Sequence, residues 1–389
     1  PWDFRVGVAL VLLVLEATRR VIGLNLTVIA VAALLFGYFG PYMPELIVHK
    51  GYSVERIATT LSLTTEGIFG LPIGVASTFV FIFILFGAFL DKTGAGNFFI
   101  DLSYSITGRF SGGPAKTAVV ASGFMGSVAG SAVANVVATG SFTIPMMKKI
   151  GYRSHVAAAV EAAASTGGQL MPPIMGAGAF LMAEFTQTPY LEIIKIALIP
   201  AVLYFFSVIL FVHFEAQKNG IWGLPKEQLP NMMEALKNGI HFIIPVAILV
   251  VVLLMNYSPM MAGFVAVIAV YATALLRKNS RISFGTLLNT LEQGARNAIT
   301  VAVACAAAGI IVGIVNLTGT GLRFSSLIVS LSGGVPLIAL FLVAFTSLLL
   351  GMGLPVTASY IVLIILAGPG LMDLGLPLLT AHMIVFWYS

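Results

Sequence analysis

Side chains that offer oxygen ligands lie among small residues in two apolar stretches of the chain. Ser127, Ser131 and Asn135 lie in the stretch GSVAGSAVAN, and Thr357 lies in GMGLPVTAS. The neighbouring glycines leave backbone carbonyls accessible, so each stretch offers oxygen ligands only. Such sets suit hard cations, and Na⁺ is the natural candidate.

The candidate cation-binding residues share one property: each lies at a point where a helix is expected to break. They are Ser127, Gly130, Ser131, Asn135, Thr166, Gly167, Gly168, Met171, Pro172, Gly351, Gly353 and Thr357. Half-helices that start at Ser131 and Thr357 would turn their N-termini toward an anionic substrate. The candidate substrate-binding residues are therefore Ser131, Ala132, Asn135, Thr357 and Ala358.

Residues 116–149 must position the first of these stretches. A single helix of that length would exceed the ~30 Å hydrocarbon core of a bilayer. Lys116 stands at one end and Lys148 and Lys149 at the other, which places both ends on one membrane face. We interpret the segment as a re-entrant hairpin that turns at Gly130-Ser131, because irregular backbone at that depth must line a cavity or be buried in protein. The alternative is a small-residue surface for helix packing.

Residues 155–184 are expected to form an interrupted helix. Thr166-Gly167-Gly168 and Met171-Pro172-Pro173 break the apolar run, and two adjacent prolines remove two backbone donors. Close helix packing explains the small residues of both segments. It explains Asn135 and Gln169 less well, because polar groups are costly within a membrane.

The composition is that of an all-α integral membrane protein. The 389 residues are 59% hydrophobic and 9% charged, with a mean hydropathy of +1.02. The expected spans are residues 21–38, 71–90, 190–214, 240–256, 260–276 and 298–315, and the expected amphipathic arms are residues 52–65, 97–108 and 283–296. The net charge of +5 does not indicate nucleic acid, because the basic residues lie in short connections. One cysteine, Cys305, excludes disulfides within the chain.

An internal repeat relates the two halves. Residues 93–96 (TGAG) correspond to 318–321 (TGTG), residues 111–114 to 332–336, and residues 126–134 to 351–359. If Arg19 and Arg20 are cytoplasmic, counting spans leaves few basic residues outside: Arg5, Lys50, Arg56, Lys195 and Arg323. The second copy then starts from the opposite face, which is typical of inverted-repeat secondary transporters with a site at the midplane.

The polar residues allow two further interpretations. Glu161 is either a functional intramembrane carboxylate or, as we favour, the ion-pair partner of Arg153 or Lys149. An enzyme would need a nucleophile with a base, or metal ligands, and the five histidines are far apart in sequence. GxSxG, HExxH and the phosphate-binding GxxxxGK[ST] are all absent from the sequence, so neither an enzyme nor an ATP-driven pump is indicated.

With these motifs in view, the chain resembles the large membrane component (DctM) of tripartite ATP-independent periplasmic (TRAP) transporters. It looks most like the fused 4-helix/12-helix permeases of the TAXI branch. The resemblance rests on LEATRRVIG, TTEGIFGLPIGV, GSAVANVVATGSFTIPMMKKIGY and EAAASTGGQLMPPIMGAGAFLMAEF. It implies an elevator-type, Na⁺-coupled importer of small organic acids in a bacterial or archaeal inner membrane, without a further cofactor. A periplasmic TAXI-type substrate-binding protein would deliver the acid. A carrier of the same architecture that needs no binding protein is the alternative.

The resemblance also implies a division of the chain. Residues 1–64 would be the tail of the small-subunit portion with a connecting amphipathic helix, and residues 65–214 the first half of the transport unit. Residues 215–239 would link it to the second half, residues 240–389. The family's second helix break would lie beyond residue 389, so we expect that the parent protein extends past both ends and that its second cation site needs residues from that extension.

Overall fold

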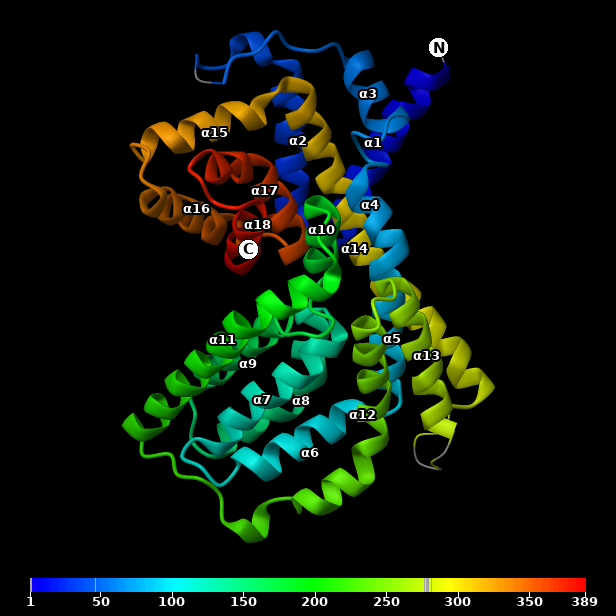
Figure 1. Cartoon of the computed structure of the whole chain (residues 1–389), viewed down its shortest axis with the longest axis vertical. Helices are drawn as coiled ribbons and strands as arrows, with labels where there is room; N and C mark the ends of the chain where they lie inside the picture. Colours follow the sequence, from blue (N-terminus) through cyan, green and yellow to red (C-terminus); the bar gives the residue numbers. More distant parts are fainter. Residues whose placement is uncertain (1, 46, 276, 278–279, 281) are drawn as a thin grey trace. The chain divides into compact units, whose positions relative to one another are not determined.

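The computed structural model describes residues 2–45, 47–275, 277, 280 and 282–389, and over these residues the regular structure is helical (Figure 1). Among the described helices, five are long and apolar enough to cross a membrane: Leu71–Lys92, Tyr190–Lys218, Met232–Leu254, Phe284–Thr318 and Val356–Asp373. The expected class, an all-helical membrane protein with several apolar spans, is confirmed. The re-entrant hairpins and the elevator motion remain predictions.

The chain forms two compact units, each built from separate stretches of sequence. The terminal unit consists of Pro1–Val80, Ala177–Thr188 and Asn297–Ser389, and the central unit of Phe81–Gly176 and Pro189–Arg296. Helix α14 (Phe284–Thr318) runs from one unit into the other. The division of the chain expected from the family resemblance concerns its repeats and remains a prediction.

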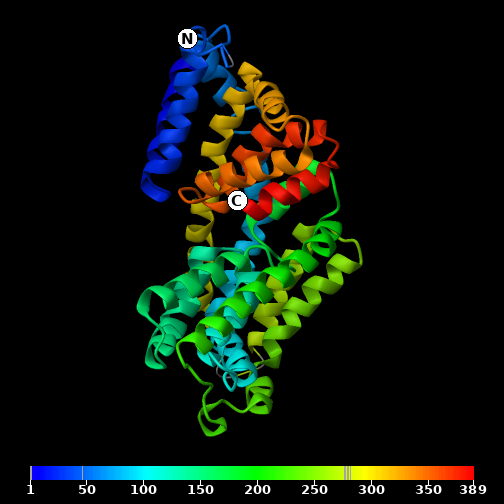
Figure 2. The same ribbon diagram turned by 90° about the vertical axis from the view of Figure 1, so that its left-hand side faces the viewer.

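The terminal unit contains both ends of the described chain. Its remaining helices are α1 (Trp2–Val21), α2 (Leu24–Tyr38), η1 (Gly40–Tyr42), α3 (Val54–Leu63), α4 (Leu71–Val75), the π-helical η2 (Ala76–Val80), α10 (Ala177–Thr186), α15 (Thr320–Leu331), α16 (Pro336–Gly351), α17 (Val356–Asp373) and α18 (Leu378–Tyr388). One hydrophobic core joins α2, α3 and α14 through the buried side chains of Leu26, Leu61, Ile310 and Ile314. Helix α17 adds Ala358 and Val362 to this core, and α16, α17 and α18 pack on one another (Figure 2).

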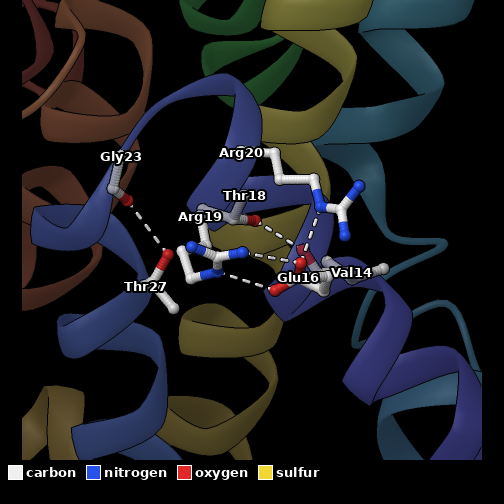
Figure 3. Close-up of polar contacts among 7 residues, drawn as sticks. All are labelled: Val14, Glu16, Thr18, Arg19, Arg20, Gly23 and Thr27. Carbon is white, nitrogen blue, oxygen red and sulfur yellow. Dashed lines mark hydrogen bonds and ion pairs between the residues drawn. The ribbon is translucent and has the colours of Figure 1, made fainter.

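A charged turn connects α1 and α2 (Figure 3). Arg19 donates to the carboxylate of Glu16, as does Arg20, and these hydrogen bonds lower the pKa of Glu16 to about 2. Glu16 is therefore ionised at neutral pH, and two guanidinium groups less one carboxylate leave one net positive charge. Gly23 makes the turn with a φ of 118°, a conformation that favours glycine.

The central unit holds the first copy of the repeat. Its helices are α5 (Phe81–Lys92), α6 (Ala95–Thr107), α7 (Gly113–Ala129), α8 (Ala132–Lys149), α9 (Ser154–Gly168), α11 (Tyr190–Lys218), η3 (Lys226–Gln228), α12 (Met232–Leu254) and α13 (Pro259–Leu275). Helix α9 packs on both α7 and α8, and α11 covers α7 and α9 (Figure 1). Small side chains such as Ala118, Ala157 and Ala164 form much of the core between them.

The repeat recurs as a sequence of elements. By the repeat expected from the sequence, helices α6 to α9 would correspond in order to α15 to α18. Gly94 and Gly319 both adopt left-handed conformations before an arm helix, with φ values of 97° and 67°. Gly151 and Gly375 do the same before the last helix of each copy, with φ values of 109° and 91°. The packing differs, because α6 packs mainly on the first hairpin helix, whereas α15 packs mainly on the second. The inverted orientation of the copies remains a prediction.

Most expected spans coincide with helices, but two expected boundaries are wrong. The span expected to start at residue 240 belongs to α12, which begins at Met232. Residues 283–296 and 298–315 were expected to be an arm and a separate span, but α14 is one helix of 35 residues. Neither glycine nor proline lies between Arg296 and Ala298, and Arg296 pairs with Glu292 across one helical turn. Nothing there ends a helix. Of the expected span 260–276, Leu276 lies outside the described residues.

Candidate functional site

The first hairpin turns where its sequence predicts. Helix α7 ends at Ala129, and Gly130 follows with a left-handed φ of 64°. Ser131 caps α8, and its hydroxyl accepts a hydrogen bond from the backbone N–H of Ala134 at 3.3 Å. Glycine is the residue that adopts this φ without strain, and serine is among the best helix N-caps. The small polar pair therefore defines the hairpin tip.

The interrupted helix breaks later than expected. Helix α9 continues through Thr166, Gly167 and Gly168, and α10 begins at Ala177. The carbonyls of residues 166–168 accept hydrogen bonds from the backbone N–H groups of residues 169–171, at 3.0–3.3 Å. The expectation that a bend at 166–168 frees these carbonyls is wrong, because the last turn tightens and satisfies them. Met171 and Pro172 do lie in the break, as expected.

The hairpin tip and the helix break contact each other within the central unit. The backbone N–H of Ile174 donates to the carbonyl of Ser127 at 3.1 Å. The side-chain amide of Gln169 donates to the carbonyl of Gly130 at 3.2 Å. The structure thus brings Ser127 and Gly130 to the helix break. Thr166 lies apart from these contacts, since its side chain is exposed and its hydroxyl donates to the carbonyl of Ala162.

Two buried amide oxygens at this place have no hydrogen-bond partner among the described residues. Asn135 is fully buried, and its Nδ2 donates to the carbonyl of Ser122 at 2.9 Å, which leaves Oδ1 without a partner. Oε1 of Gln169 is likewise buried and unpartnered. A buried acceptor left unsatisfied costs about 1–3 kcal/mol. These two oxygens are the strongest candidates for cation ligands, and Gln169 was not among the expected site residues.

Glu161 is held by hydroxyl groups. The side chain is fully buried, and its carboxylate accepts from Ser122 of α7 at 3.1 Å, from Ser165 of α9 at 3.2 Å, and from Thr139 and Thr143 of α8. The expected ion pair with Arg153 or Lys149 is wrong, because the ion pairs among the described residues do not include Glu161. Four hydroxyl groups from three helices bond to the Glu161 carboxylate, where a basic side chain was expected.

The sequence did carry a signal for this cluster. Asn135, Thr139 and Thr143 recur every four residues, which places them on one face of α8. Glu161 and Ser165 have the same spacing on α9. A polar stripe on an otherwise apolar helix points to a polar partner on a neighbouring helix.

The second hairpin tip lies in the terminal unit and is held differently. Helix α17 begins at Val356 after Pro355, which puts Thr357 and Ala358 in its first turn, within one residue of the expected start. Side-chain Nδ2 of Asn25 on α2 donates to the carbonyl of Gly353 at 3.2 Å. At Gly351, a Cβ would lie 2.8 Å from the carbonyl oxygen of Ser389. The meeting of the two tips at the midplane remains a prediction.

The candidate substrate residues of the first tip sit at a helix N-terminus. Ser131 and Ala132 are half-buried, and the first N–H groups of α8 have no partner within the helix. Such groups can receive a carboxylate. Two cavities of about 340 and 400 Å³ among the described residues lie elsewhere, and none of the candidate site residues lines them.

Comparison with known families and proteins points to one kind of protein. The family described as "Tripartite ATP-independent periplasmic transporter, DctM component" matches residues 9–389. The C4-dicarboxylate TRAP transporter large permease protein DctM of Vibrio cholerae is 31% identical over 195 residues, which are 49% of this chain and 40% of that protein. The isethionate TRAP transporter permease protein DctMQ of Oleidesulfovibrio alaskensis is 29% identical over 181 residues, 40% of this chain and 28% of that protein.

A third relative aligns with more of the chain. The 2,3-diketo-L-gulonate TRAP transporter large permease protein YiaN of Escherichia coli is 24% identical over 286 residues, 72% of this chain and 65% of that protein. The matched part of the chain thus spans less than half the length of the first two relatives. The three names give three different substrates.

Proposed function

Because the chain belongs to the DctM-component family of tripartite ATP-independent periplasmic transporters, we propose that it is the permease part of a TRAP transporter that imports small organic acids. Family membership makes it a multi-pass protein of the bacterial inner membrane and a transporter component rather than an enzyme. The acids would be carboxylates delivered by a periplasmic substrate-binding protein. The match over residues 9–389 is the observation that carries this proposal.

Coupling to Na⁺ is the second part of the proposal. The unpartnered oxygens of Asn135 and Gln169 support it, because two buried amide oxygens beside a hairpin tip suit a hard cation. Asn135 is held with its oxygen free, since the bond from Nδ2 to Ser122 requires the nitrogen on that side. The residues of the first tip would thus hold one Na⁺, which is carried as a co-substrate. The inward transport of Na⁺ and the acid would follow the elevator scheme.

The assignments to the TAXI branch and to a fused permease rest on the sequence resemblance. We propose that the protein is a fused permease of the TAXI branch, with residues 1–64 contributed by the small-subunit portion. The binding protein would then be of the TAXI type. Substrate identity falls largely to that partner, since the first hairpin tip carries no charged side chain between Gly126 and Asn135.

Reconstituted uptake tests the whole proposal. The full-length protein that contains this chain would be placed in proteoliposomes and supplied with a panel of small carboxylic acids. We expect uptake only with both Na⁺ and the binding protein, and none when choline replaces Na⁺. Uptake without a soluble partner would instead favour a carrier that works without a binding protein.

A further inference from the structure

We propose that Glu161 is a positioning residue of the first cation site: it fixes the amide of Asn135 so that Oδ1 faces the ion. This inference rests on the proposed Na⁺ coupling and adds a residue to it. Glu161 itself would not touch the ion. It would act through Ser122 and Thr139, which lie between it and Asn135.

The first connection runs through α7. Ser122 donates its hydroxyl proton to Glu161 Oε1 at 3.1 Å, while its backbone carbonyl accepts from Asn135 Nδ2 at 2.9 Å. One residue therefore touches the carboxylate with its side chain and the amide with its backbone. The orientation of the Asn135 amide depends on where Ser122 lies.

The second connection runs along α8. The single hydroxyl proton of Thr139 is shared between Glu161 Oε1 and the carbonyl oxygen of Asn135, which lies 2.8 Å from Thr139 Oγ1. Thr143 contacts the other carboxylate oxygen. Glu161 thereby fixes the rotation of α8 relative to α7 and α9, and with it the direction in which Asn135 points.

The close approach of α7 and α9 adds to this geometry. A Cβ at Gly168 would lie 2.6 Å from the Cα of Gly126, and both glycines border the amide nitrogen of Asn135. The backbones confine that amide, so a small displacement of one helix would move it. A carboxylate that accepts from all three helices is suited to prevent this displacement, whereas a neutral amide provides one acceptor and introduces two donor protons.

The cost of burial supports a role beyond packing. Glu161 is fully buried, and the described residues supply it with hydroxyls instead of a basic partner. Buried acidic groups in membrane segments are expensive and are retained at functional places. Apolar residues of similar volume would join three helices at least as well. The role that the geometry assigns to Glu161 is to orient the amide of Asn135.

Na⁺-dependent thermal stabilisation of the purified full-length protein tests the inference without a substrate or a partner. NaCl would be exchanged for choline chloride at constant ionic strength. For Glu161→Gln we expect the Na⁺ concentration that gives half of the stabilisation to rise about tenfold, as the loss of one ligand-orienting contact implies. Ser122→Ala removes the hydroxyl that bonds to Glu161 but keeps the backbone carbonyl that bonds to Asn135. It should shift the Na⁺ midpoint in the same direction. This second variant keeps the test valid if Glu161→Gln does not fold.

The control is Thr117→Val. Thr117 is another buried hydroxyl of α7, but it bonds to Thr107 and to the carbonyl of Gly113. This variant should lower the melting temperature without changing the Na⁺ midpoint. Glu161→Gln should also change nothing further in an Asn135→Leu background, because the residue through which it acts is gone.

The outcomes separate the two proposals. A parent protein that responds to Na⁺, with Glu161→Gln and Ser122→Ala variants that keep its midpoint, overturns the positioning role alone. A parent protein whose stability is the same in Na⁺ and choline overturns the Na⁺ coupling, and the positioning role with it.

Discussion

Gly126 and Gly168 face each other where α7 crosses α9, and a Cβ at Gly126 would lie 2.4 Å from the Cα of Gly168. The nearest obstacle is backbone and cannot rotate aside as a side chain could, and the Cβ would also lie 2.8 Å from Nδ2 of Asn135. We predict that Gly126→Ala separates the two helices and destabilises the protein by about 1–3 kcal/mol, the range for overpacked cores. A lowered melting temperature of the detergent-purified protein would reveal it.

Gly74 supplies the matched control. It is also a helical glycine, in α4, but a Cβ there would meet nothing within 4 Å. Alanine has a higher helix propensity by up to about 1 kcal/mol, so Gly74→Ala should leave stability unchanged or raise it. If both variants melt like the parent protein, the close approach of α7 and α9 is not present in solution.

A second prediction concerns the cation ligands. Asn135→Leu removes a buried oxygen that has no other partner, whereas Thr166→Val removes an exposed hydroxyl that already donates to the carbonyl of Ala162. We expect Asn135→Leu to raise the Na⁺ requirement for uptake about tenfold or more, since one ligand contributes about 1–3 kcal/mol. Thr166→Val should have a smaller effect. Uptake titrated against Na⁺ in proteoliposomes decides it, with expression level and monodispersity as controls.

The opposite ranking of these two variants would count against a cation site at Asn135. If Thr166→Val weakens the Na⁺ response more than Asn135→Leu, the ion lies toward the exposed side of α9. If neither variant changes it, these residues serve helix packing and the cation binds elsewhere.

How far the sequence predicts this structure depends on whether a feature is local. The turn at Gly130-Ser131 follows from one glycine and one N-cap serine, and the break at Pro172-Pro173 follows from two missing backbone donors. Both are properties of a few consecutive residues. The sequence does not show that α14 is continuous, because a change from polar to apolar residues does not by itself end a helix.

The partners of the site residues were harder to predict, because they come from other parts of the chain. Glu161 was assigned the nearest cations along the sequence, but its partners Ser122 and Thr139 lie 39 and 22 residues away. Asn25 contacts Gly353 across 328 residues. Hydrophobic periodicity shows which face of a helix is buried, but not which neighbour covers it.

A third prediction concerns the second hairpin tip. Asn25→Ala removes the side chain that donates to the carbonyl of Gly353. Because Asn25 is exposed, we expect a loss of only about 0.5–1.5 kcal/mol in stability, typical of one hydrogen bond. Thr27→Val is a suitable control, since the Thr27 hydroxyl donates only to Gly23 within its own turn (Figure 3). Equal melting temperatures for the Asn25→Ala variant and the parent protein would show that the tip is not held by this bond.

The last prediction concerns the membrane topology of the first hairpin, and the structure determines which positions can report it. Lys116 is unsuitable for labelling because it is 9% exposed and its Nζ donates to Nδ1 of His213 at 3.1 Å. Arg109 and Lys148 are exposed; Arg109 lies just before the start of α7, and Lys148 lies in the last turn of α8. Cysteines at these two positions are therefore the informative probes, and the native Cys305 is buried.

If the hairpin is re-entrant, both ends lie on the cytoplasmic face. A membrane-impermeant maleimide added to intact spheroplasts should then label neither Arg109→Cys nor Lys148→Cys, and should label both after the membrane is opened. Lys50→Cys, in a connection expected on the periplasmic side, is the positive control and should react in intact spheroplasts. Two ends on opposite faces would give one reactive and one protected position, and this result would mean that residues 116–149 cross the membrane instead of returning to the side from which they entered.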